Sequence, residues 1–198
     1  MYVQLQCRSP ILLQRLVPAF PVTLTAWGIG HSIFHDGYRR RLPPGQPVHM
    51  PAFSSFDLQL TGHTFNAAAC ALELDEAGTD DVLASASAKR DKALPAQLSR
   101  LIFHSPDTPW NAHSVASALG MEPRRLQQLL FARGAALGQL CKTQRLMRAL
   151  LESAQTEMPV GHLKRRIGWP ETRDLEAPFY EWFGVSLQTV ARLRGNTL

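Results

Sequence analysis

Residues 110–130 read WNAHSVASALGMEPRRLQQLL, with two helix-sized apolar patterns on either side of a tight break. The arrangement recurs further along the chain, in a region that closes on IGWPETRDLEAPFYEWFGVSLQTVARLRG, residues 167–195. A longer apolar pattern of helical period lies between the two regions. Two helix-turn-helix units joined by a long helix are therefore predicted.

The first unit carries clear start and stop signals. Asn111 is a good N-cap, and Val115 and Leu119 fall on one face of a helix predicted over residues 112–119. Gly120 ends that helix. Pro123 suits a first helical position, because the amide that it lacks would have had no partner within the helix. A second helix is therefore predicted to begin at Pro123.

This second helix has one apolar and one polar face. The apolar stripe consists of Leu126, Leu129 and Leu130. Arg124, Gln127 and Gln128 share the opposite face, and in the major groove of DNA Arg can pair with guanine and Gln with adenine. Arg125 lies to one side and is predicted to contact a phosphate. A plain solvated face is the alternative interpretation.

These residues resemble the DNA-binding half of AraC/XylS-family bacterial transcriptional regulators. The matching pieces within residues 97–194 are Trp110, ALGMEPRRLQQLL, RLMRALL from Arg145, VGHLKRRIGW from Val160 and FYEWFGVS from Phe179. The resemblance implies an α+β protein, in which a mostly β N-terminal domain for sensing or dimerisation precedes an all-α tandem helix-turn-helix domain. It also implies that Thr172 and Arg173 face bases.

Basic residues elsewhere in the helical half admit two interpretations. The run Lys164, Arg165 and Arg166 falls on the first helix of the second unit, where a contact with the DNA backbone and a solvated face both remain open. Arg145 lies on the long central helix and is predicted to tie that helix to its neighbours through charged hydrogen bonds.

The second unit departs from the family pattern at Pro178. This proline falls inside a second recognition helix predicted over residues 171–183, where it would remove a hydrogen bond to the carbonyl of Asp174 at a cost of roughly 3 kcal/mol. Charge points the same way, since residues 95–170 carry a balance of +6 and residues 171–198 a balance of −1. The first unit is therefore predicted to dominate base reading.

Composition bounds the class of protein. The chain has 198 residues and a net charge of +5, with equal numbers of basic and acidic side chains in residues 1–94, so the excess lies in the helical half. Three widely spaced cysteines give no disulfide framework, and no stretch reads as a signal peptide or membrane span. A cytoplasmic protein without membrane contact is predicted.

The N-terminal half reads mostly as strands. YVQLQC and FDLQL alternate in polarity, VTLTAW is rich in β-branched and aromatic residues, and TFNAAACALELD fits a long strand or a helix. A partial barrel or an open sheet is predicted. Residues 80–93 fit a linker or an exposed helix, and Pro95 is predicted to open a short helix, which gives two domains over residues 1–94 and 95–198.

Other functional sites receive weaker support from the sequence. His31, His35 and His49 could converge on a metal, as in cupins, although no carboxylate stands at a familiar distance from them. Cys7 and Cys70 are conceivable redox sensors, and the arginine run at 39–41 is a surface loop or an anion site. No paired carboxylates, Ser-His-Asp set or phosphate-cradling glycine loop indicates an enzyme, and no cofactor is predicted.

Two functions therefore compete. The first is a sequence-specific transcription regulator, an activator, that binds double-stranded DNA mainly through the first unit, with RNA polymerase and a second copy of the chain as further partners. In this function the N-terminal half makes the homodimer, and an effector is left unidentified. The second is a partner-dependent regulatory module for protein interaction whose second unit is impaired by Pro178.

Overall fold

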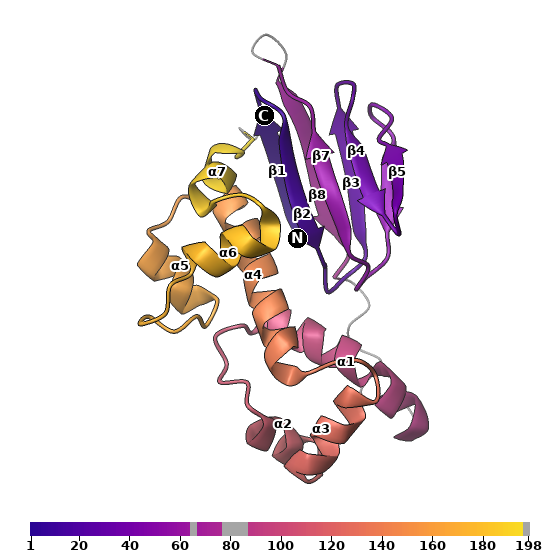
Figure 1. Cartoon of the computed structure of the whole chain (residues 1–198), viewed down its shortest axis with the longest axis vertical. Coiled ribbons are helices and arrows are strands. Elements are labelled where there is room, and N and C mark those ends of the chain that lie inside the picture. The colour runs from indigo at the N-terminus through magenta and orange to yellow at the C-terminus, as the bar shows by residue number, and fades with distance from the viewer. Residues whose placement is uncertain (64–66, 77–86, 196–198) are drawn as a thin grey trace.

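The computed structural model describes residues 1–63, 67–76 and 87–195, in which a β-rich half precedes a helical half (Figure 1). The strands are β1 (Tyr2–Cys7), β2 (Ile11–Leu16), β3 (Val22–Trp27), β4 (Ser32–His35), β5 (Tyr38–Arg41), β6 (Pro47–Met50), β7 (Phe56–Leu60) and β8 (Ala68–Leu74). The helices are α1 (Ser87–His104), α2 (Ala112–Ala118), α3 (Pro123–Phe131), α4 (Leu137–Gln155), α5 (Val160–Arg166), α6 (Glu176–Phe183) and α7 (Leu187–Arg192). The α+β class predicted from the sequence is confirmed.

The strands form two antiparallel sheets, in the orders β1-β8-β3-β6 and β2-β7-β4-β5. Alternate side chains of β1, namely Val3, Leu5 and Cys7, face the common core. The β-rich half is therefore a two-layer sandwich of short strands. Within the stretch that fits a strand or a helix, residues 68–74 are a strand, and residues 64–66 lie outside the described part of the chain.

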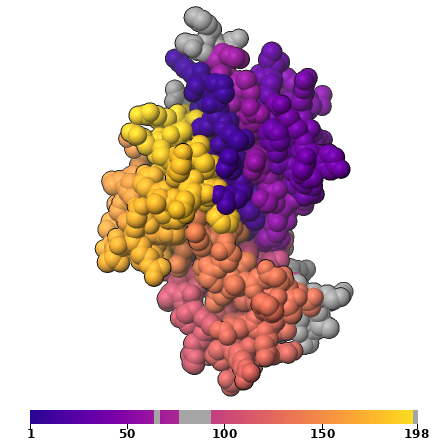
Figure 2. All heavy atoms as spheres, viewed as in Figure 1, coloured from indigo at the N-terminus to yellow at the C-terminus, as the bar shows by residue number. Residues whose placement is uncertain are grey.

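The sandwich shares one hydrophobic core with the second helix-turn-helix unit. Leu13 and Leu58 of the sheets, Leu150 of α4, and Phe179 and Phe183 of α6 all belong to this core and are almost fully buried. Figure 2 shows the second unit lying directly against the first strands, whereas the first unit projects beyond them. The β-rich half and the second unit are thus packed as one body.

A reciprocal clasp between Arg15 and Trp182 fixes α6 to the edge of β2. The Arg15 guanidinium donates to the carbonyl oxygens of Glu181 and Trp182 at the end of α6, the latter at 3.0 Å. The Trp182 indole donates to the Arg15 carbonyl at 3.1 Å, and the guanidinium lies 5.1 Å from the centre of its ring. The cation thereby satisfies carbonyls that the helix leaves unpaired at its C-terminus.

The chain segment after α7 covers the edge of β1. The Gln6 amide donates to the Leu193 carbonyl, and the Gly195 amide donates to the Gln4 carbonyl at 3.1 Å. This pairing extends the first sheet by a short antiparallel bridge between Leu5 and Arg194. Part of the β1 edge is therefore covered by the helical half, which protects it from pairing with other chains.

Helix α1 begins at Ser87, so the prediction that it opens at Pro95 is wrong. Leu94, Leu98 and Ile102 form a buried stripe at a spacing of four residues, and this stripe starts before the proline. Packing of this stripe against the first unit offsets the free-energy cost of the backbone hydrogen bond that Pro95 cannot donate. Of the predicted linker or exposed helix over residues 80–93, residues 87–93 are helical and residues 80–86 lie outside the described chain.

A second, smaller core holds the first helix-turn-helix unit. It joins α1 to α2, α3 and the start of α4, and its buried members are Leu94, Leu98, Ile102, Val115, Ala116, Leu126, Leu130 and Cys141. Arg145 links α4 to the loop before α2, since its guanidinium donates to the carbonyls of Pro106 and Thr108 at 2.9 and 3.2 Å. The structural role predicted for Arg145 is confirmed. None of the described helices is long and apolar enough to cross a membrane.

Candidate nucleic-acid interface

The start of the first unit forms as its sequence predicts. The Asn111 side chain accepts a hydrogen bond of 2.9 Å from the Ser114 amide, which caps α2. Gly120 has a φ of +65°, a conformation that suits glycine, and it separates α2 from α3. Pro123 occupies the first turn of α3. These local signals set the angle at which α3 leaves the turn.

Helix α3 presents a polar face to solvent. Leu126 and Leu130 are buried in the second core, which fixes the rotation of the helix about its axis. Arg124, Gln127 and Gln128 are exposed, as predicted. Among the described residues, none of these three side chains has a hydrogen-bond partner, and the same holds for Arg125 beside them. Their donors and acceptors are therefore free to meet a ligand.

Phe131 lies on the same face and is absent from the sequence-based prediction. It is the last residue of α3 and is 83% exposed. Its place seven residues after Arg124 is the signal that puts it on the polar face, since seven residues make about two helical turns. Beside it is a cavity of about 680 Å³, lined by Gln127, Gln128 and apolar side chains of the α2 and α4 ends.

The second recognition helix is shorter than predicted, because α6 begins at Glu176 rather than at residue 171. The Asp174 carboxylate starts it by accepting hydrogen bonds from the amides of Ala177 and Glu176, at 3.0 and 3.1 Å. These bonds hold the pKa of Asp174 below its usual value. The Asp174 carbonyl is paired with the Trp169 indole at 3.0 Å.

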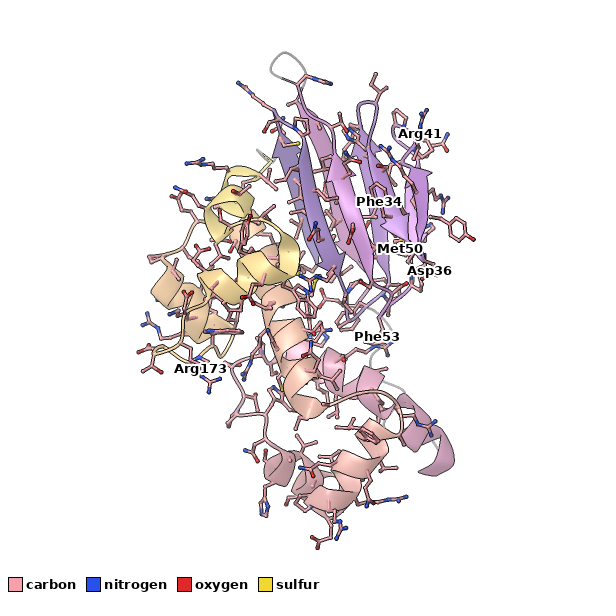
Figure 3. All side chains as sticks on the ribbon, in the orientation of Figure 1. Phe34, Asp36, Arg41, Met50, Phe53 and Arg173 are labelled. Atoms are coloured by element: carbon pink, nitrogen blue, oxygen red, sulfur yellow. The ribbon has the colours of Figure 1, made fainter. Side chains whose placement is uncertain are left out.

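Pro178 therefore stands in the first turn of α6, where an amide has no partner within the helix. The prediction of a damaged or kinked helix is wrong for this reason. Thr172 and Arg173 lie in the turn before α6, exposed and outside the helix on which the resemblance places them. Figure 3 shows Arg173 on the outer side of the second unit, away from the sheets.

Pro178→Ala is expected to leave the free energy of unfolding unchanged or to lower it by up to about 1 kcal/mol. The reason is that a proline compatible with its backbone stabilises mainly by restricting the unfolded chain. Urea unfolding of the two proteins measures the difference. A gain of 2 kcal/mol or more would mean that the proline does disrupt a helix. Asp174→Ala, which removes the carboxylate that accepts hydrogen bonds from the Glu176 and Ala177 amides, is expected to lower the free energy of unfolding.

The basic run of α5 is largely paired within the molecule. Lys164 donates to the Glu171 carbonyl at 3.2 Å, and the Arg165 guanidinium lies 3.6 Å from the Glu171 carboxylate. Arg166 makes two contacts of 2.9 Å with the Glu152 carboxylate, and this hydrogen-bonded pair raises the pKa of Arg166. Arg166 thus ties α5 to α4, and the contrast with the unpaired arginines of α3 is clear.

The histidines and cysteines do not form the sites considered for them. His31 is buried between the Trp27 carbonyl and the Thr61 amide, at 3.0 Å from each. His35, in the second sheet, contacts Ser54 and Asp36. His49 and its partner Thr23 both lie in the first sheet. In the described parts of the chain, no three potential metal ligands gather. Burial raises the pKa of the thiols of Cys7 and Cys70, that of Cys70 to about 12, which disfavours the reactive thiolate.

Comparison with known proteins shows which solved structures have a similar fold. No protein-family model and no curated protein sequence matches the chain. A structure of unsaturated fatty acid bound wild-type ToxT from Vibrio cholerae strain SCE256 is similar, with a TM-score of 0.68, 8% identity, and coverage of 100% of this chain and 96% of that one. ToxT from Vibrio cholerae O395 has a TM-score of 0.65 and 11% identity, with coverage of 99% and 98%.

ToxT is an AraC-family regulator, and this chain has its fold over nearly its whole length. The fold class implied by the AraC/XylS resemblance, a β-rich half followed by two helix-turn-helix units, is therefore confirmed. The face of α3 described above belongs to the first of these units.

Proposed function

We propose that this protein is an AraC/XylS-family transcription regulator that binds double-stranded DNA and is not an enzyme. The observation that supports this most is the face of α3, where Arg124, Gln127 and Gln128 are exposed together and unpaired within the described chain. A protonated guanidinium recognises guanine, and a carboxamide recognises adenine, each through two hydrogen bonds in the major groove. The first unit is proposed as the main reader.

The spacing of the two units suits a single face of DNA. They stand at opposite ends of α4, whose 19 residues make it about 28 Å long. One turn of B-DNA is about 34 Å, so the units can approach successive major-groove segments. In this arrangement Arg125, Lys164 and Arg165 are proposed to contact phosphates. Thr172 and Arg173 are proposed to approach bases from the turn before α6.

Arg166 is the weakest of the proposed phosphate contacts, because Glu152 already holds its guanidinium. The β-rich half, proposed as residues 1–94, is the candidate for homodimerisation, and residues 95–198 are the proposed DNA-binding domain. We propose activation through RNA polymerase in the cytoplasm as the outcome of binding.

A partner-dependent function is the second candidate, and one observation favours it. The end of α6 is held on β2 by the clasp between Arg15 and Trp182, and two side chains of the basic run of α5, Arg165 and Arg166, already contact the carboxylates of Glu171 and Glu152. A second unit in this state contributes little charge to DNA. A protein partner that stabilises the first unit on DNA would then supply the missing affinity.

Gln127→Ala is expected to relax the preference for one base pair by about 1–3 kcal/mol, because it removes one pair of hydrogen bonds to a base edge. The measurement is the affinity for a set of duplexes in which each position of the binding site is changed in turn. Unchanged preference at every position would show that Gln127 does not read a base.

Arg125→Ala is the matched control for that experiment. It is expected to weaken binding to all duplexes alike and to lower the slope of log affinity against log salt concentration by about 1, since one phosphate contact is lost. A loss confined to particular sequences would assign Arg125 to a base instead.

A further inference from the structure

The reading face of α3 ends on an aromatic side chain. Arg124, Gln127, Gln128 and Phe131 follow one another at helical positions i, i+3, i+4 and i+7, so they lie along one stripe. Phe131 is 83% exposed, whereas Leu126 and Leu130 of the same helix are buried. An exposed aromatic ring in line with base-reading side chains is a candidate contact for DNA.

The surface around Phe131 is apolar and continuous with the polar reading residues. The cavity of about 680 Å³ beside it has walls from Trp110, Ala135 and Leu137, and Gln127 and Gln128 line the same cavity. Each of its lining residues is uncharged. An apolar group on a base edge would therefore leave water and enter this cavity without burying a charged side chain of its lining.

Charge around this apolar surface favours nucleic acid as its occupant. Arg124 and Arg125 precede Phe131 on α3, and Arg133 follows it by two residues, all three exposed. A second copy of the chain seated here would bring these arginines against their equivalents and be repelled. DNA offers phosphates to the arginines and, in the major groove, one apolar group, the 5-methyl group of thymine.

We propose that Phe131 reads thymine through its 5-methyl group, and this inference rests on the DNA-binding function proposed above. Phe131 lies four residues beyond Gln127, about 6 Å along the helix axis. Successive base pairs are about 3.4 Å apart, so the thymine lies roughly two base pairs beyond the base that Gln127 contacts. The ring packs against the methyl group, and the apolar walls of the cavity exclude water around the contact.

Deoxyuridine provides the test, because it lacks only the methyl group of thymidine. Each thymidine of the preferred duplex is replaced in turn by deoxyuridine, and affinity is measured for the full-length wild-type protein and for Phe131→Ala. Wild type is expected to lose about four-fold in affinity at one position, the effect of one buried methyl group. Phe131→Ala is expected to bind more weakly overall and to show no further loss at that position.

Two variants serve as controls. Gln127→Ala is expected to keep the response to deoxyuridine, since it leaves the ring in place, and Phe131→Leu is expected to keep part of it. The inference would be overturned if wild type and Phe131→Ala lost the same affinity on deoxyuridine replacement, or if wild type lost none. The proposed DNA-binding function would stand in either case, provided that wild type still prefers particular DNA sequences. If Phe131→Ala binds DNA as wild type does but fails only to activate transcription, a protein partner occupies this surface and the inference is wrong. Failure of wild type to prefer any sequence would overturn both proposals.

Discussion

Replacing Phe183 by alanine is expected to lower the free energy of unfolding by about 3–5 kcal/mol. Phe183 is fully buried, its ring centre lies 4.8 Å from that of Phe179, and both rings belong to the core that the sandwich shares with the second unit. The substitution leaves a cavity where α6 meets β2. Its effect should therefore reach the sheets as well as the helices.

Urea unfolding measures the size of the loss, and hydrogen exchange measured peptide by peptide shows where it is felt. Amides of β2, β7 and α4 are expected to lose protection together with those of α6. Phe131→Ala is the matched control, since the same change at a side chain that is 83% exposed should alter stability by less than about 0.5 kcal/mol. A loss of protection confined to α6 and α7 would contradict a shared core.

Glu152→Ala is expected to cost about 2–3 kcal/mol of stability. Glu152 is 4% exposed and accepts hydrogen bonds of 2.9 Å from both Arg148 and Arg166, so its removal leaves two cations without their partner. The Arg148 side chain is 20% exposed and that of Arg166 is 57% exposed. Loss of the contact with Arg148 should therefore account for the larger part of the lost stability. Thermal unfolding of the variant at several salt concentrations measures this loss.

Glu157→Ala is the control for Glu152. The Glu157 side chain is 88% exposed and lies 3.5 Å from Arg194, and exposed pairs of this kind contribute about 0–1 kcal/mol. Equal effects of the two substitutions would mean that Glu152 acts as a surface charge and does not organise the second unit.

The first helix-turn-helix unit could be predicted because its signals are local. Asn111 caps a helix through an amide three residues away, Gly120 adopts a positive φ, and Pro123 occupies a first turn. Each of these effects acts within a few residues and reads the same in sequence and in structure. The orientation of Arg124 and Gln127 then follows from helical geometry alone.

The second unit could not be predicted in the same way, because its geometry depends on contacts between distant segments. The start of α6 is set by the Asp174 carboxylate and by the Trp169 indole on the Asp174 carbonyl, neither of which an apolar pattern reveals. The clasp between Arg15 and Trp182 joins residues 167 positions apart. The apolar pattern therefore predicts Pro178 in a helix interior, whereas the helix begins at Glu176 and Pro178 lies in its first turn.

The β-rich half lies between these cases. Alternation of polarity predicts its strands, because inward and outward side chains alternate along each one. The pairing of β1 with β8 and of β2 with β7 depends on contacts across the chain, so the arrangement into two sheets could not be read from the strands themselves. The covering of the β1 edge by the segment after α7 is equally invisible in the sequence.

Selection of bound sequences from a random DNA pool, with purified full-length protein at low and near-physiological salt, tests base reading by α3 most directly. The expected product is a motif with one strong box that contains the guanine and adenines that suit Arg124, Gln127 and Gln128, retained at the higher salt. A second box about one helical turn away would show that the turn before α6 reads bases too. No enrichment at either salt would contradict sequence-specific DNA binding by this protein.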